Sequence, residues 1–141
     1  MTAMYSRNLA SQYKQTGVTS AVLDADPHKL ISLLFAGVRE RLKLAAACMH
    51  NGNVSRKGEA IGQVSLIIGN LDGTLDHQAG GEIAANLGAL YEYAQQRLVE
   101  ANLRNDPMIL LEIDGLFADI EAAWNSINPQ AAAPQKLEVV G

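Results

Sequence analysis

The residues best suited to metal or nucleophilic chemistry are few in this sequence. His28, His50 and His77 are its three histidines, and Cys48 is its single cysteine. A di-iron bundle uses Glu-x-x-His on two helices and a c-type haem uses C-x-x-C-H, but neither motif occurs here. No serine, threonine or cysteine stands in a recognisable nucleophile motif, and the glycines form no phosphate-binding loop. We therefore predict no metal, no cofactor and no enzymatic activity.

Two closely spaced tyrosines are more informative. They lie in residues 87–102, LGALYEYAQQRLVEAN, where leucine and alanine recur with helical spacing. At ~100° per residue, Tyr91 and Tyr93 point about 200° apart, so a single core cannot hold both. Tyr91 falls beside Leu87 and Leu98, and we predict that it is buried. We predict that Tyr93 either contacts a partner, as tyrosine often does at interfaces, or covers a neighbouring helix as a half-exposed residue.

A row of glycines is the second unusual feature. The row lies beside the apolar stripe of residues 54–75 and consists of Gly58, Gly62, Gly69 and Gly73. Each interior glycine costs roughly 0.5–1 kcal/mol against alanine, so four on one line suggest a close approach. Two interpretations stay open: a neighbouring helix of the same chain approaches the row, or a partner helix lies on it. In the second interpretation, Leu66 and Ile67 border a binding groove.

Four long helical patterns position these residues. Asp26 and Pro27 suit the N-cap and first turn of the first helix, and Asp106 and Pro107 suit those of the fourth. The helices are expected from residue 27 to the NGN stretch at 51–53, from about 54 to 75, from near 82 to the RNDP stretch at 104–107, and from there to about 128. Their predicted core residues are Leu30, Leu34, Val38, Leu42, Ala45 and Met49; Ile61, Val64, Ile68, Leu71 and Leu75; Ile83, Leu87, Leu90, Ala94, Leu98 and Ala101; and Ile109, Ile113, Leu116, Ile120 and Ile127.

Connections of only a few residues force consecutive helices to run antiparallel. We therefore predict an all-α fold, an antiparallel up-down-up-down four-helix bundle formed by residues 26–128. Residues 1–25 are expected to form a short amphipathic leader, which is too short to be a stable helix alone. Its one-sided apolar stripe consists of Tyr5, Leu9 and Tyr13. Residues 129–141 are expected to be a disordered tail.

Composition excludes several classes of protein. The 141 residues are 48% apolar and 18% charged, which favours one domain with a core over general disorder. No apolar run approaches ~18 residues and the N-terminal residues lack an apolar signal-peptide core, so we predict neither a membrane span nor secretion. A single cysteine fits a reducing cytoplasm, where Cys48 would be a small apolar filler. The net charge of −4, with Arg39, Arg41 and Lys43 predicted on a solvated helix face, argues against nucleic-acid binding.

The segment GGEIAANLGALYEYAQQRLVEAN resembles the hallmark third helix of the flagellar export chaperone family FliS. Further matching segments occur in the same order as in the family: Tyr13-Lys14, DADPHKLISLLFAG, NLDGTLD before Gly80-Gly81, and Trp124. The resemblance covers about residues 4–128. This chain departs from the family pattern in having Asp-Pro where Ser-Pro is frequent at the first helix, and in the glycine content of the second helix.

The resemblance implies a non-enzymatic cytoplasmic chaperone that binds the disordered C-terminal segment of flagellin, which folds into helices around the bundle. Binding would prevent premature polymerisation, and the complex would be presented to an export-gate protein. Whether an anti-sigma factor or a co-chaperone also binds stays open, as do two other hypotheses: a self-associating bundle and a helical adaptor for a different client. The predicted partner-binding residues are Tyr5, Leu9, Tyr13, Gly62, Leu66, Ile67, Gly69 and Tyr93.

Overall fold

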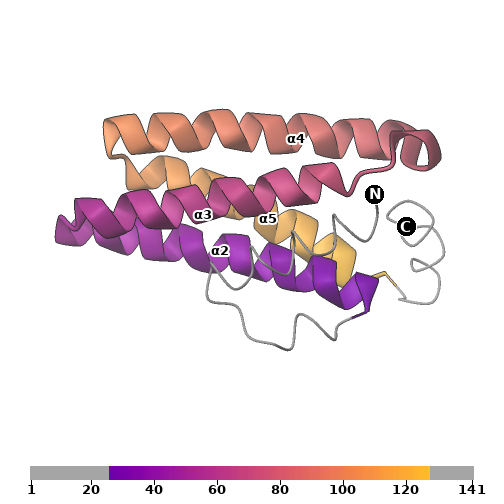
Figure 1. Ribbon diagram of the computed structural model, residues 1–141, viewed down its shortest axis with the longest axis horizontal. Helices are drawn as coiled ribbons and strands as arrows, with labels where there is room; N and C mark the ends of the chain where they lie inside the picture. The colour runs from indigo at the N-terminus through magenta and orange to yellow at the C-terminus, as the bar shows by residue number, and fades with distance from the viewer. Residues whose placement is uncertain (1–25, 128–141) are drawn as a thin grey trace.

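The computed structural model describes residues 26–127, which form four helices (Figure 1). The helices are α2 (Pro27–Asn51), α3 (Val54–Gly73), α4 (His77–Arg104) and α5 (Pro107–Asn125). This part of the chain contains no strand, so the predicted all-α class is confirmed. The expected leader at 1–25 and the expected tail at 129–141 lie outside the described residues.

Each helix packs against its neighbour in the chain, and α5 returns to pack against α2. Because turns of two or three residues join the helices, consecutive helices run antiparallel, as Figure 1 shows. The contacts α2–α3, α3–α4, α4–α5 and α5–α2 enclose one core, to which all four helices contribute apolar side chains. This arrangement is the predicted up-down-up-down bundle.

Capping residues determine where the helices begin. The Asp26 carboxylate accepts a hydrogen bond from the Lys29 amide at 2.7 Å, and the Asp106 carboxylate accepts one from the Met108 amide at 2.9 Å. A proline follows each aspartate, where its missing N–H would have had no partner in the helix. The predicted starts of the first and fourth helices are therefore confirmed, while Asp76 caps α4 earlier than expected.

The early start of α4 includes a break in the helix at Gly81. Its backbone has φ 53° and ψ −125°, a conformation that glycine adopts much more readily than other residues. Residues 77–80 thus form a first turn, and the long straight part of α4 follows the break. The predicted start of the third helix near residue 82 matches the part of α4 that follows the break, but helical residues 77–80 precede it.

Tyr91 lies in the core with 3% of its surface exposed, as predicted. Its ring stacks on Phe117 of α5 with a centroid distance of 6.1 Å and an interplanar angle of 13°. Phe117 also contacts Phe35 of α2 at a centroid distance of 6.3 Å. Aromatic pairs of this kind add about 0.5–1.5 kcal/mol to the free energy of area burial, so these rings join three of the four helices.

One end of the bundle is held by a reciprocal contact between α2 and α5. The rings of His28 and Trp124 stack at a centroid distance of 4.7 Å. The Trp124 Nε1–H donates to the carbonyl oxygen of His28 at 3.0 Å, and His28 Nε2 lies 3.1 Å from the carbonyl oxygen of Trp124. The start of α2 and the end of α5 are therefore fastened to each other by two hydrogen bonds and a ring stack.

Two predicted core residues are exposed, which corrects the sequence-based core. Ile83 is 72% exposed, and Ile127, which is 40% exposed, lies beyond the end of α5 at Asn125. The exposure of Ile83 follows from a difference in length, because α4 has 28 residues and α5 has 19. Running antiparallel from their shared turn, α5 ends before it reaches the first turns of α4.

The predicted solvated face of Arg39, Arg41 and Lys43 is wrong for Arg41, while Arg39 keeps 28% of its side chain exposed and forms ion pairs with α5. Arg39 donates from Nε to Asp114 at 2.9 Å and from Nη1 to Glu121 at 2.8 Å, both on α5. These hydrogen bonds, the one to Asp114 first, raise the pKa of the Arg39 guanidinium above its usual value. Arg41 is buried, whereas Lys43 is exposed as predicted. Long charged side chains readily bury their apolar stems, so the presence of an arginine or lysine in the sequence does not by itself predict a solvent-exposed residue.

The buried position of Tyr91 predicts a change in alkaline stability. Burial, followed by the negative charge of Asp72, raises the pKa of the Tyr91 hydroxyl. The folded state thus holds this proton more tightly than the unfolded chain, so the stabilisation is complete below the unfolded pKa of ~10 and declines as the pH rises above it. Tyr91→Phe should therefore lose less stability between about pH 8 and about pH 11 than the unmodified protein. Urea unfolding at both pH values measures this, and equal losses in the two proteins would contradict it.

Candidate partner-binding surface

The glycine row of α3 faces outward. Gly62 and Gly69 are exposed. Within the described part of the chain, a β-carbon added at Gly58, Gly62 or Gly69 would meet no atom within 4 Å. The interpretation that a neighbouring helix of the bundle approaches the row is therefore wrong at these three positions. The other interpretation, that a partner lies on the row, stays a prediction.

The two apolar residues predicted to border the row have different environments. Leu66 is partly exposed on the same outward side as Gly62 and Gly69. Ile67 is 2% exposed, and its Cδ1 would lie 3.5 Å from a β-carbon at Gly37 of α2. The prediction that Ile67 borders an outward groove is wrong, because Ile67 packs at the contact between α3 and α2, beside a residue that has no side chain.

A reciprocal pair of hydrogen bonds shows which side of α3 meets α4. The Ser65 hydroxyl donates to Gln95 Oε1 at 2.7 Å, and Gln95 Nε2 donates to the carbonyl oxygen of Ser65 at 2.9 Å. Because Ser65 faces α4 and Ile67 faces α2, the side between them that carries Leu66 and the glycine row faces away from the bundle.

Tyr93 lies on the side of α4 that faces α5. Its side chain is 41% exposed, as predicted, but its hydroxyl is engaged and donates to Glu112 Oε2 at 2.5 Å. Arg97 Nε donates to Glu112 Oε1 at 2.8 Å. The hydrogen bond from Tyr93, followed by the one from Arg97, lowers the pKa of Glu112, and the same Tyr93–Glu112 bond raises the pKa of Tyr93.

The structure therefore does not bring the predicted partner-binding residues Leu66, Ile67 and Tyr93 together on one surface. Leu66 lies on the outer side of α3, Ile67 is in the core, and Tyr93 lies beside α5. What the structure does bring together is a smooth strip on α3, formed by Gly62, Leu66 and Gly69. Outside the described residues lie Tyr5, Leu9 and Tyr13.

Exposed apolar side chains on α4 and α5 were missed by the sequence-based prediction. Besides Ile83, four of them are at least 60% exposed: Val99, Leu103, Met108 and Leu111. Val99 and Leu103 are four residues apart and so share one side of α4. This spacing was visible in the sequence as apolar residues outside the core stripe, which is the signal that would have found them.

The other chemistry-bearing residues stay apart. His28, His50 and His77 lie near three different helix ends, as predicted. Within residues 26–127, no three histidine, cysteine, aspartate or glutamate side chains gather closely enough to hold a metal ion. Across the same residues, no helix combines the length and the apolar character needed to cross a membrane.

The fold and the surface together define a four-helix-bundle protein that carries spare apolar side chains on its outer faces. Comparison with protein families then assigns it more closely, because residues 9–131 match the family described as Flagellar protein FliS. The chain belongs to this family, which agrees with the resemblance seen in its third helix.

Relatives of this chain are similar along almost their whole lengths. The chain is 44% identical over 130 residues to the flagellar secretion chaperone FliS of Salmonella typhimurium, a match that covers 92% of this chain and 96% of the relative. It is 42% identical over 125 residues to the flagellar secretion chaperone FliSB of Pseudomonas aeruginosa, covering 89% and 99%. The flagellar secretion chaperone FliS of Bacillus subtilis is 34% identical over 121 residues, covering 86% of each chain.

The open glycine row predicts that alanine stabilises the bundle. Gly62→Ala or Gly69→Ala should each raise the free energy of unfolding by roughly 0.5–1 kcal/mol, because alanine loses less backbone entropy in a helix and its methyl group would lie more than 4 Å from neighbouring atoms of residues 26–127. Gly80→Ala is the matched control, since its β-carbon would lie 2.8 Å from that of Ala84 and should destabilise the fold. Urea unfolding measures all three variants. A loss of stability at Gly62 and Gly69 would show that the row is packed from within.

Proposed function

We propose that this protein is a cytoplasmic flagellar secretion chaperone. In this proposal it binds the disordered C-terminal segment of flagellin, prevents premature polymerisation of flagellin and presents the complex to an export-gate protein. The observation that carries the proposal is membership of the FliS family over residues 9–131, together with relatives named flagellar secretion chaperone, one of which is 44% identical to this chain. Binding, rather than catalysis, is the proposed activity.

The distribution of exposed apolar side chains supports a flexible client. Leu66 lies on α3, Val99 and Leu103 lie on α4, and Met108 and Leu111 lie on α5. A rigid partner meets one face of a molecule, whereas a disordered segment wraps around it and contacts several faces in turn. The client would become ordered as it binds, and such ordering consumes part of the interaction energy, ~2–5 kcal/mol or more.

The glycine row supports a helical conformation for part of the bound client. Packed helices lie about 8–10 Å apart, and the side chains at the contact set the distance. At Gly62 and Gly69 no side chain stands between the backbone of α3 and an approaching helix. Leu66 between them supplies apolar contact area. The strip therefore suits a client helix that approaches closely.

The leader belongs to the proposal as well. We propose that Tyr5, Leu9 and Tyr13 cover part of the client surface when no client is bound, and that the leader also contacts the export gate. An anti-sigma factor or a co-chaperone would need a surface that the client leaves free.

Two rival functions make different predictions in solution. A self-associating bundle would use its exposed apolar side chains in contacts between copies and would sediment as an oligomer with or without a flagellin tail peptide. A helical adaptor for a different client would bind neither flagellin nor the peptide. The proposed chaperone forms a complex, expected to be one to one, when the peptide is added.

Removal of the flagellin tail is the direct test. The protein should bind full-length flagellin much more tightly than flagellin that lacks its C-terminal segment, because that segment supplies the apolar groups buried in the complex. Binding should show a negative heat-capacity change. Titration calorimetry at several temperatures measures both quantities. Equal affinity for the two flagellins would exclude this client segment.

The glycine row is tested separately with larger side chains. Gly62→Leu or Gly69→Leu should weaken binding of flagellin at least tenfold, because the new side chain stands where the client helix would approach. The fold should persist, since these positions are open and surface substitutions usually change stability by less than about 0.5 kcal/mol in either direction. Ala47→Leu places the same side chain on an exposed position of α2 and serves as the control. If both glycine variants bind flagellin normally, the glycine row is not part of the surface that binds the client.

A further inference from the structure

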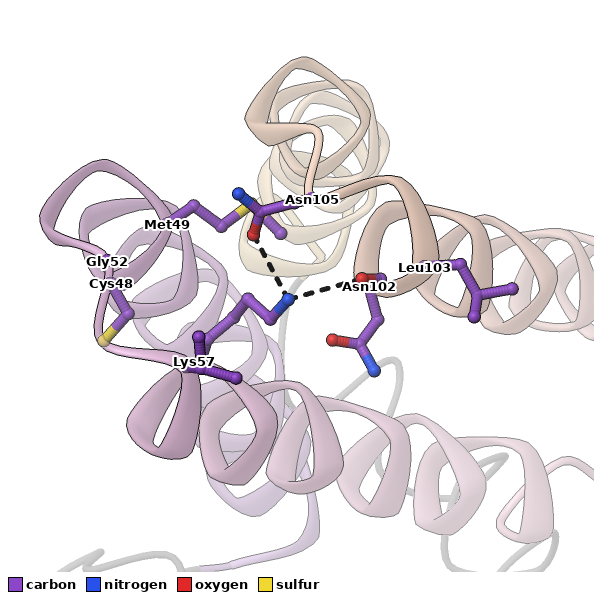
Figure 2. A pocket seen from close by; sticks show the side chains of 8 residues that line it. Cys48, Met49, Gly52, Lys57, Asn102, Leu103 and Asn105 are labelled. Atoms are coloured by element: carbon purple, nitrogen blue, oxygen red, sulfur yellow. Dashed lines mark hydrogen bonds between the residues drawn. The ribbon is translucent and has the colours of Figure 1, made fainter.

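A pocket of about 260 Å³ lies at the end of the bundle where the α2–α3 and α4–α5 turns meet (Figure 2). This end is opposite the contact between His28 and Trp124. Its walls include the apolar side chains of Cys48, Met49, Val54 and Leu103 and the polar side chains of Lys57 and Asn105. None of them belongs to the glycine row or to the predicted partner-binding residues.

The pocket contains a buried lysine, Lys57, that forms no ion pair with any other residue of the described range 26–127. Lys57 is 8% exposed in the first turn of α3. Its Nζ donates to the carbonyl oxygen of Asn102 at 3.3 Å and to Asn105 Oδ1 at 3.1 Å, and Figure 2 shows both bonds crossing from α3 to the end of α4. Both acceptors are neutral, and no ion pair to Lys57 forms within residues 26–127. An ammonium group has three donors, so one N–H is left for another acceptor.

Capping of α4 accounts for part of this arrangement. The Asn102 carbonyl belongs to the last turn of α4, where carbonyl groups lack partners within the helix and a cation is favourable. Capping alone needs neither the burial of the ammonium nor a pocket beside it. A buried cation next to neutral acceptors is costly compared with one that also meets a carboxylate. The first turn of α3 lies at the same place, and its peptide dipoles also favour an anion.

The other walls of the pocket indicate the shape of the ligand. Met49 and Cys48 are buried and apolar, while Val54 and Leu103 are 72% and 80% exposed. The volume is smaller than the roughly 300–1,000 Å³ of sites for drug-sized ligands, so the pocket suits one side chain or one chain end. The exposed Val54 and Leu103 would contact the rest of the polypeptide that carries it.

We propose that this pocket binds a carboxylate on a short aliphatic stem, supplied by a partner polypeptide. The carboxylate oxygen accepts the third N–H of Lys57, and the stem packs against Met49 and Leu103. An acidic side chain and a chain-terminal carboxylate share this chemistry, and the test below separates them. The proposal does not depend on the flagellin client.

The first experiment compares a carboxylate with its neutral amide. Cys48 is the single cysteine of the chain and lines the pocket, so its rate of modification by iodoacetamide reports occupancy. The unmodified protein is titrated with 4-methylpentanoate and with 4-methylpentanamide. Half-maximal protection of Cys48 should need at least tenfold less carboxylate than amide, because only the carboxylate brings a negative charge that pairs with the buried ammonium of Lys57. Equal protection by the two compounds, or none by either, would overturn the proposal.

The second experiment assigns the preference to Lys57. Lys57→Met keeps a long apolar side chain but removes the charge, and it should abolish the difference between carboxylate and amide. Lys43→Met removes an exposed charge from α2 and should keep the difference. A folded Lys57→Met protein that still prefers the carboxylate would overturn the proposal. If Lys57→Met does not fold, the comparison in the unmodified protein still decides.

Blocked peptides identify the source of the carboxylate. Acetyl-Ala-Ala-Leu with a free C-terminus tests a chain end, and its C-terminal amide is the control. Acetyl-Ala-Glu-Leu-amide tests an acidic side chain, and the glutamine version is the control. Protection of Cys48 by one acidic peptide, but not by its control, supports the proposal and names the source. If neither acidic peptide protects Cys48, the proposal that a polypeptide supplies the carboxylate is wrong.

Discussion

The rest of the bundle depends on the packing of α2 against both α3 and α5. Ten of the 25 residues of α2 are buried, compared with five of 28 in α4. Buried apolar area contributes roughly 25 cal/mol per Å², so α2 supplies a larger share of the hydrophobic stabilisation than α4 does. The bonds of Arg39 to Asp114 and Glu121, and the stack of His28 on Trp124, add polar and aromatic contacts between α2 and α5. Most of the stabilising contacts of the bundle therefore join α2 to α3 and α5.

The helix α4 completes the core with smaller side chains. Three of its five buried residues are alanines, and Tyr91 and Leu98 are its two large ones. A segment with few buried apolar contacts opens locally at a lower free-energy cost than the rest of the fold. The apolar residues that α4 does not bury, such as Val99 and Leu103, are left for contacts outside the bundle. Under the proposed function, α4 is the helix that would adjust most readily to a client.

How far the sequence predicts this structure depends on the range of each interaction. Asp26 and Asp106 were assigned as caps because an N-cap bonds to an amide two or three residues away. The angle between Tyr91 and Tyr93 on one helix likewise separated the buried ring from the exposed one. The burial of Ile67 could not be predicted, because it depends on Gly37 of another helix. The same holds for Lys57, whose partners Asn102 and Asn105 lie at the far end of α4.

A network of charged residues between α4 and α5 interrupts the exposed apolar surface of these two helices. Arg97 bonds to Glu112 and Glu100, and Glu100 also accepts a hydrogen bond from Arg104. Exposed ion pairs contribute only about 0–1 kcal/mol each to the free energy of folding, so the network adds little to the stability of the bundle. Its position has a clearer consequence, because it places charge among the exposed apolar residues of the two helices. A dimer contact needs about 800 Å² of continuous surface from each partner. Apolar positions separated by charge serve such a contact poorly, whereas a flexible segment can follow a path from one apolar position to the next.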